Sequence, residues 1–143
     1  LFELDGEEQE TLHRLLADFA VPDRSLGKMS TGNQLKFSLA LAFARKSPVL
    51  LLDEPTAGLD IFGVEILTRL IKERTEAGLA TLVATHQPTL TPDLFQRAVV
   101  IDQGRLLYDG NLAGLLQLAP DESEAVTTRL AIAMARLIAG TTT

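Results

Sequence analysis

The sequence predicts an α/β fold, with a mostly parallel sheet that is followed by a terminal antiparallel hairpin. Two short apolar runs, residues 49–52 and 79–85, alternate with helical patterns along the chain. Strands that alternate with helices indicate parallel pairing, because each helix returns the chain to the same end of the sheet. Two later strands, residues 98–101 and 105–108, flank the turn sequence DQG, and this arrangement predicts the hairpin.

The first third of the chain predicts two helices. Residues 7–19 indicate an amphipathic helix, because apolar residues recur at helical spacing: Leu12, Leu15, Leu16 and Phe19. The first turn of this helix is acidic, and the helix dipole favours negative charge there. Residues 31–46 indicate a second helix, with Ser30 as its N-cap. Apolar residues nearly surround the axis of the second helix, so we expect it to be buried.

The middle of the chain predicts two buried strands that are joined by a helix. Pro48 introduces the apolar run at residues 49–52, which ends in two acidic residues and is typical of a central strand buried on both faces. Residues 79–85 indicate a second buried strand. The connecting helix has Gly78 as its expected C-cap and carries an apolar stripe: Val64, Leu67, Leu70 and Ile71.

Two helices are expected after the hairpin. Residues 112–118 indicate a short helix, and residues 122–138 indicate a longer one. Residues 119–121 lie between them and include a proline, which is typical of a linker because proline does not continue a helix. We therefore divide the chain into three parts: residues 1–46, 47–118 and 119–143.

The composition limits the classes of function. The net charge is −6, so the phosphate backbone of nucleic acid would be repelled, and we expect no direct nucleic-acid partner. Cysteine is absent, which excludes disulfides, thiolate metal sites and cysteine nucleophiles. No apolar stretch approaches the roughly 20 residues that span a bilayer, and no basic leader opens the chain. We therefore expect a soluble protein that is linked to a membrane, if at all, through a partner. The first residue is leucine, which suggests that the sequence is a piece of a longer protein.

Two carboxylates follow the strand at residues 49–52. This edge of an open α/β sheet is where ligands bind. Asp53 can hold Mg²⁺, a hard cation that takes oxygen ligands and keeps much of its water shell. Glu54 can orient and deprotonate a water that attacks a phosphoryl group. Taken alone, the two acids would equally fit a strand that ends in solvent.

The longer string DEPTAGLD at residues 53–60 favours a functional site over a strand that merely ends in solvent. With this string the chain resembles the ABC ATPase family. The resemblance implies that Asp53 coordinates Mg²⁺ and that Glu54 is the catalytic base. It also implies that residues 58–60, which end in Asp60, form the D-loop that communicates between two protomers and lies at the nucleotide.

A second candidate site precedes the helix at residues 31–46. A serine cap and a glycine at a helix N-terminus form an anion site, because backbone N–H groups there can approach a phosphate closely. The sequence MSTGN at residues 29–33 stands where the family's signature, most often LSGGQ, would lie. By resemblance, this loop contacts the γ-phosphate of ATP held by the opposite protomer, through Ser30, Thr31, Gly32 and Asn33. The chain departs from the common pattern at Thr31, Asn33 and Leu35.

His86 follows the second predicted strand and emerges at the same sheet edge as Glu54. A lone histidine after a strand is usually an ordinary polar loop residue. The spacing from Glu54 accommodates one helix and one strand, which brings the chain back beside the first strand. The resemblance implies that His86 is the switch histidine, which bonds the γ-phosphate and helps to position the attacking water.

The phosphate-binding loop of this family is missing from the sequence. That loop has the pattern G-x-x-x-x-G-K-[ST], and the single Gly-Lys pair, at residues 27–28, fails because Pro22 and Met29 occupy two required positions. The resemblance therefore covers the C-terminal half of an ABC nucleotide-binding domain. It implies part of a three-layer P-loop NTPase fold, with the remnant of a helical subdomain. We expect the chain alone to bind ATP poorly and to be inactive.

These observations favour an ATPase subunit of an ABC transporter that uses ATP and Mg²⁺. Its expected partners are a second ABC ATPase domain and a transmembrane transporter subunit, at the cytoplasmic face of the membrane. One alternative is a soluble ABC-type ATPase that acts on nucleic acid or ribosomes. The other is a noncatalytic half-domain that only binds partners, although such a module needs neither Asp53, Glu54 nor His86.

Overall fold

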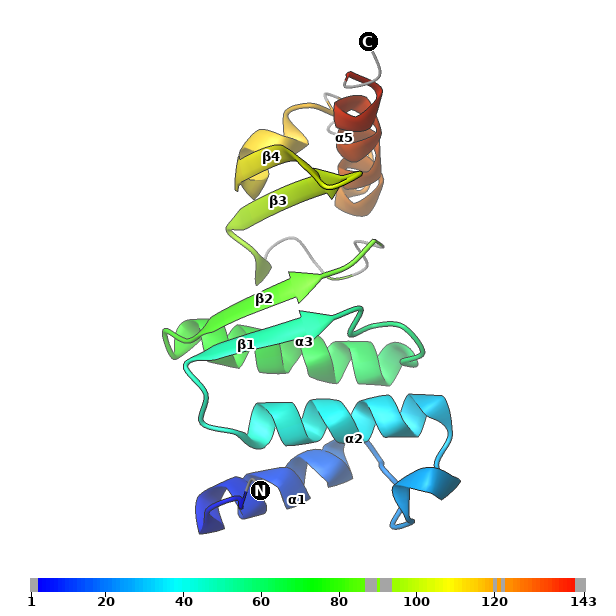
Figure 1. The fold of residues 1–143 in the computed structure, drawn as a ribbon, viewed down its shortest axis with the longest axis vertical. Coiled ribbons are helices and arrows are strands. Elements are labelled where there is room, and N and C mark those ends of the chain that lie inside the picture. The colour runs from blue at the N-terminus through cyan, green and yellow to red at the C-terminus, as the bar shows by residue number, and fades with distance from the viewer. Residues whose placement is uncertain (1–2, 87–89, 91–93, 120, 122, 141–143) are drawn as a thin grey trace. The chain divides into compact units, whose positions relative to one another are not determined.

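The computed structural model describes residues 3–86, 90, 94–119, 121 and 123–140. The chain divides into two compact units, residues Leu1–His86 and Gln87–Thr143 (Figure 1). Each unit contains one two-stranded sheet, parallel in the first and antiparallel in the second. The predicted α/β class with a terminal hairpin is confirmed. Among the described residues, no helix is both long and apolar enough to cross a membrane.

The first unit follows the predicted order of helices and strands. Its elements are α1 (Gly6–Asp18), the short 3-10 helix η1 (Leu26–Lys28), α2 (Thr31–Ala44), β1 (Val49–Asp53), α3 (Ile61–Glu76) and β2 (Ala80–Ala84). Helix α1 packs against α2, and Leu15 and Phe19 are almost completely buried. Leu39, Ala40, Phe43 and Ala44 are the buried residues of α2.

A reciprocal pair of hydrogen bonds starts α1. The Glu8 backbone N–H donates to Asp5 Oδ1 at 2.8 Å, and the Asp5 N–H donates to Glu8 Oε2 at 3.1 Å. This capping box satisfies two of the amide groups that a helix start leaves unpaired. Lys46 Nζ lies 3.0 Å from Asp5 and 2.7 Å from Glu7, so the acidic first turn is linked to the chain that leads into β1.

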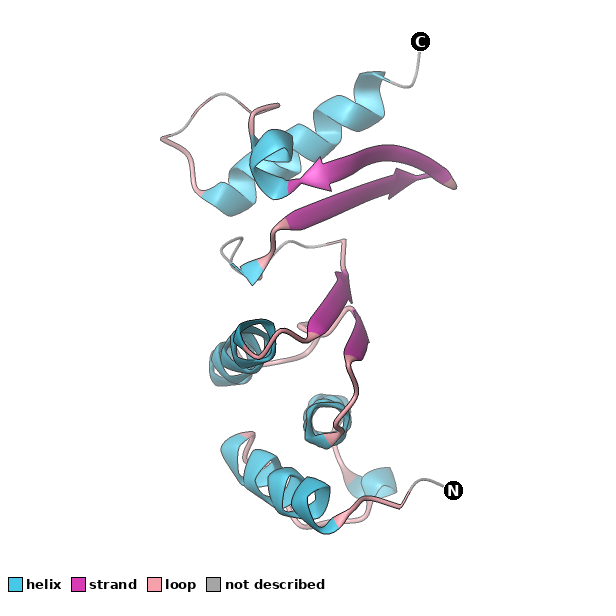
Figure 2. Ribbon diagram, turned by 90° about the vertical axis from the view of Figure 1, so that its left-hand side faces the viewer, coloured by secondary structure: helices cyan, strands magenta, loops and turns pink. Residues whose placement is uncertain are grey.

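The sheet of the first unit is covered on one face only. β1 and β2 pair in parallel from Val49↔Ala80 to Asp53↔Ala84, and α3 packs against β2 (Figure 2). Leu50 and Leu52 are buried, but Leu51 is 68% exposed and Leu82 is 60% exposed. The predictions of a first strand buried on both faces and of a second buried strand are therefore wrong for this structure. Side chains alternate between the two faces of a strand, and the described residues leave the second face open.

The second unit consists of a hairpin backed by two helices. Strands β3 (Arg97–Asp102) and β4 (Arg105–Asn111) are joined by Gln103 and Gly104, which have φ values of 46° and 75°. Two positive φ values are typical of the type I′ turn, whose twist matches that of the strands. Helices α4 (Leu112–Leu116) and α5 (Val126–Gly140) pack with the hairpin around a shared core. The buried residues of this core are Val100, Leu112, Leu115, Ala119, Leu130 and Ala133. The predicted final helix starts later than expected, and Pro120 and Glu122 lie outside the described residues.

Candidate functional site

The turn after β1 places Glu54 in an unusual backbone conformation. Its φ is 44°, in the left-handed region that residues with a side chain rarely adopt. The Glu54 N–H donates to Ala84 O at 2.8 Å, and the next residue, Pro55, is buried. The end of β2 therefore fixes the backbone at Glu54. Such conformations cluster at functional sites, where the surrounding structure holds them in place.

The Glu54 carboxylate is held by the two residues that follow β2. Thr85 Oγ1 donates to Glu54 Oε2 at 2.8 Å. The His86 backbone N–H donates to Oε1 at 2.7 Å, and His86 Nδ1 lies 2.5 Å from the same oxygen. With Ala84, three consecutive residues thus contact Glu54. His86 was predicted to emerge at the same sheet edge as Glu54, and the structure places the two residues in direct contact there.

These contacts lower the pKa of Glu54. The largest cause is the hydrogen bond with the His86 side chain, and the Thr85 hydroxyl acts in the same direction, whereas partial burial opposes both. The carboxylate is therefore ionised at neutral pH. About a third of its side chain is exposed, as is most of the His86 ring, so both groups can reach a solvent-side ligand.

Asp53 is the last residue of β1 and is exposed. Within the part of the chain that the structure describes, no group of three or more His, Cys, Asp or Glu side chains could hold a metal ion. One accessible carboxylate at a strand end nonetheless suits Mg²⁺, which often binds proteins through one or two carboxylates and otherwise keeps water and phosphate ligands. The chemistry of Asp53 fits the predicted role.

The predicted signature loop forms the N-terminus of α2. Ser30 is the N-cap, as predicted, and its Oγ accepts from the Asn33 N–H at 3.3 Å. Thr31 is exposed, while Gly32 and Asn33 are half-buried. A Cβ at Gly32 would lie 2.9 Å from the Gly58 carbonyl oxygen. Only glycine allows this helix start to approach the loop at residues 58–60 so closely.

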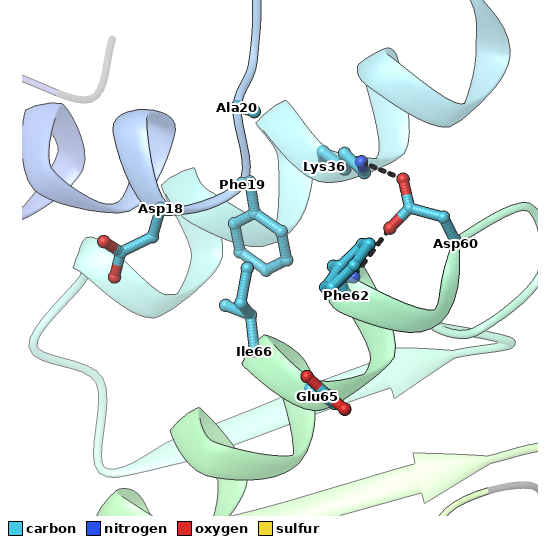
Figure 3. Close-up of a pocket in the computed structure, with 9 residues that line it drawn as sticks. Asp18, Phe19, Ala20, Lys36, Asp60, Phe62, Glu65 and Ile66 are labelled. Carbon is cyan, nitrogen blue, oxygen red and sulfur yellow. Dashed lines mark hydrogen bonds and ion pairs between the residues drawn. The ribbon is translucent and has the colours of Figure 1, made fainter.

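Asp60 connects the same loop to two helices (Figure 3). It is the N-cap of α3, where its Oδ1 accepts from the Gly63 N–H at 2.7 Å, and its Oδ2 lies 2.6 Å from Lys36 Nζ on α2. The ion pair with Lys36 is the largest cause that lowers the Asp60 pKa, followed by the Gly63 N–H. The structure thus brings Glu54 together with His86, and it places the loop of residues 58–60 next to α2 through Gly58 with Gly32 and Asp60 with Lys36. Asp53 lies directly before Glu54, at the end of β1.

Two residues of these groups were not predicted from the sequence, namely Lys36 and Thr85. Lys36 lies 24 residues before Asp60, so no local spacing indicates their contact. Thr85 follows a strand that predicts only an apolar interior. Its position directly before His86 is the one available hint, because side chains at the end of a strand reach the ligand edge of the sheet.

The sequence is similar to those of known ATP-binding proteins. Residues 6–91 match a family described as "AAA domain, putative AbiEii toxin, Type IV TA system". Over 111 residues the chain is 36% identical to the hemin import ATP-binding protein HmuV of Rhodococcus jostii, a match that covers 78% of this chain and 36% of the relative. It therefore spans well under two thirds of that relative's length.

Solved structures show the same fold. A structure titled as the ATP binding subunit of an ABC transporter matches with a TM-score of 0.72 at 20% identity, over 91% of this chain and 55% of the other. The cassette MJ0796, described as a dimer in a post-hydrolysis state bound to ADP and Pi, matches with a TM-score of 0.64 at 24% identity. That match covers 78% of this chain and 50% of the cassette.

Proposed function

Because this chain belongs to a family of P-loop ATPase domains and to the ATP-binding domains of ABC transporters, we propose that it supplies half of an ATP-hydrolysing site. The contact between Glu54 and His86 carries this proposal. It joins an ionised carboxylate and an imidazole on the exposed edge of a parallel sheet, where nucleotides bind in α/β folds.

Glu54 acts as the general base. Its carboxylate is ionised at neutral pH and oriented by donors on both oxygens, so it can accept a proton from an attacking water. His86 contacts Glu54 through Nδ1, and most of its side chain is exposed, so we propose that the same residue bonds the γ-phosphate. Asp53 would hold Mg²⁺, which neutralises the charge that develops on the phosphates.

The signature loop serves a different nucleotide. Ser30, Thr31, Gly32 and Asn33 form the N-terminus of a helix, whose N–H groups and dipole favour an anion. We propose that this anion is the γ-phosphate of ATP bound to a second ABC ATPase domain, and that Asp60 lies at the same interface. The dimeric form of the cassette MJ0796 supports the pairing of two such domains.

The cradle for the β- and γ-phosphates is proposed to come from polypeptide outside this sequence. No G-x-x-x-x-G-K-[ST] motif occurs in the 143 residues. The isolated chain would then bind ATP poorly and would not hydrolyse it. In this proposal, residues 1–46 belong to the helical subdomain, residues 47–118 to the catalytic core and residues 119–143 to a C-terminal helix.

We propose that the complete protein works at the cytoplasmic face of a membrane with a transmembrane transporter subunit. The proposal rests on the relatives, which are ATP-binding proteins of transporters. The negative charge of this chain argues against direct contact with nucleic acid. Hydrolysis in the ATPase dimer would drive movement of the transmembrane partner.

Substitution of Glu54 tests the proposed function. In the natural polypeptide that carries this sequence, Glu54→Gln should lower ATP turnover by at least about 100-fold, because the amide cannot accept the proton. ATP binding, measured with a fluorescent analogue, should persist, because Gln keeps the shape of the side chain. Glu76→Gln removes a carboxylate from the exposed face of α3 and should leave turnover unchanged. Equal turnover of Glu54→Gln and the natural protein would contradict the assignment.

A further inference from the structure

Helix α2 and the D-loop touch at two separate points within one chain. At the first point, the Gly32 Cα is so close to the Gly58 carbonyl that a Cβ would lie 2.9 Å from its oxygen. One turn later, Lys36 Nζ lies 2.6 Å from Asp60 Oδ2. Gly32 and Lys36 are four residues apart, so they lie on the same face of the helix. The loop at residues 58–60 is therefore fixed to α2 at both of its ends.

In the ion pair at the second point the lysine is shielded from solvent, whereas the Asp60 side chain is 55% exposed. The Lys36 side chain is only 13% exposed, and its ammonium group reaches Asp60 beside the Phe19 and Phe62 rings (Figure 3). Asp60 is held in turn by the Gly63 N–H at 2.7 Å. Both oxygens of this carboxylate are thus engaged, one by each helix, which fixes the orientation of the side chain.

The D-loop continues backward into the turn that holds Glu54. The Leu59 N–H donates to Thr56 O, and the Ala57 N–H donates to Glu54 O, each at 3.1 Å. Residues 54–60 therefore form a short, internally bonded segment. A displacement of residues 58–60 would be passed along this segment to the backbone of Glu54, whose positive φ already depends on its surroundings.

We propose that Lys36 is a positioning residue that couples the signature loop to Glu54 through Asp60. This inference rests on the proposed function, in which the signature loop binds the ATP of the opposite domain. When that phosphate pulls on the start of α2, the latch formed by Gly32–Gly58 and Lys36–Asp60 moves the D-loop with the helix. The Glu54 carboxylate then reaches its catalytic position only when both nucleotides are in place.

The test compares turnover and ATP affinity in the natural polypeptide that carries this sequence. Lys36→Met should lower kcat about tenfold with little change in KM for ATP, because Lys36 itself contacts neither phosphate nor base in the proposed site. Lys36→Arg, which can still pair with a carboxylate, should restore most of the loss. Asp60→Asn should match Lys36→Met, since asparagine remains a good N-cap for α3 and only the charge is lost. The double variant should be no slower than either single one.

A matched ion pair provides the control. Arg69 Nη2 on α3 lies 2.7 Å from Asp18 Oδ2, at the end of α1, and thus joins the same α3 to a helix that carries no site residue. Arg69→Met should leave kcat unchanged. If Lys36→Met and Asp60→Asn both retain kcat within about twofold while Glu54→Gln is inactive, the latch is refuted and the proposed function stands. If Glu54→Gln retains turnover, the proposed function fails and the coupling proposal fails with it.

Discussion

Thr85 shows how a single hydroxyl can set both the orientation and the acidity of Glu54, the proposed base. Its Oγ1 donates to Glu54 Oε2, whereas the two contacts from His86 both reach Oε1. Without Thr85, one carboxylate oxygen would lose its donor from the end of β2. A hydrogen bond to the ionised form stabilises that form, so the hydroxyl contributes to the lowered pKa of Glu54.

We predict that Thr85→Val moves the acidic limb of the pH–rate profile. Removal of the donor should raise the Glu54 pKa back toward its ordinary value of 4.5, so activity should begin to fall at a higher pH than in the natural protein. The kcat at neutral pH should also fall, by roughly tenfold, because one oxygen is no longer oriented. The measurement is kcat/KM for ATP between pH 4 and pH 8.

Thr85→Ser is the matched control, since it keeps the hydroxyl and removes only a methyl group. Its acidic limb should coincide with that of the natural protein. A valine variant whose limb also coincides with that of the natural protein would show that the hydroxyl does not act on the base.

At the scale of elements, Arg74 ties the last turn of α3 to the starts of both parallel strands. The side chain is 7% exposed, and Nη2 donates to Ser47 O at 2.9 Å and to Ala80 O at 3.4 Å. Nε donates to Thr81 Oγ1 at 3.3 Å. Burial lowers the pKa of Arg74, yet the guanidinium stays charged because an arginine side chain is protonated throughout the physiological pH range. The cation also lies at the helix C-terminus, where the dipole favours it.

Arg74→Met should destabilise the first unit by about 2 kcal/mol, because the hydrogen bonds that this nearly buried side chain makes to Ser47, Ala80 and Thr81 are lost. Urea unfolding of the natural polypeptide, followed by circular dichroism, measures this change. Arg69→Met, on the exposed face of the same helix, should cost less than about 1 kcal/mol. Equal losses for the two variants would mean that the buried contacts contribute no more than a surface pair.

The helices and strands were largely predictable from the sequence, but the side-chain contacts between them were not. The spacing of apolar residues, the N-cap at Ser30 and the turn at Gly104 are features of short stretches of sequence, so helices, strands and the hairpin could be placed within a few residues. Contacts such as Arg74 with Ser47 or Lys36 with Asp60 join residues 27 and 24 positions apart. Nothing local specifies them, because they depend on how the helices pack.

The site was predictable to the extent that β-sheet topology dictates it. Asp53 ends β1 and His86 follows β2, and parallel strands bring their carboxyl ends to one edge, so the meeting of Glu54 with His86 could be expected. The sequence did not predict the positive φ of Glu54 or the exposed sheet face around Leu51 and Leu82. An apolar strand pattern indicates burial in the complete fold, whereas the described residues cover only one side of the sheet.

At the scale of the whole molecule, carboxylates stabilised by hydrogen bonds determine the response to acid. The pKa is lowered for Asp5 by the Glu8 N–H and Lys46, for Glu54 by His86, for Asp60 by Lys36, and for Asp121 by Ser123. A group whose pKa is lower in the folded state binds fewer protons there than in the unfolded state. Its stabilising contribution is complete above the ordinary pKa and is lost as the pH falls through the lowered value.

We therefore predict that the unfolding free energy of the natural polypeptide falls as the pH drops below the ordinary values of 4.5 for Glu and 3.8 for Asp. Urea midpoints at intervals from pH 7 to pH 3 measure this loss. Asp60→Asn should show a shallower fall over the same range, because asparagine cannot take up the proton that Asp60 binds on unfolding. Stability that rose on acidification, or an Asp60→Asn variant with an equally steep fall, would contradict the role assigned to the pair of Lys36 and Asp60.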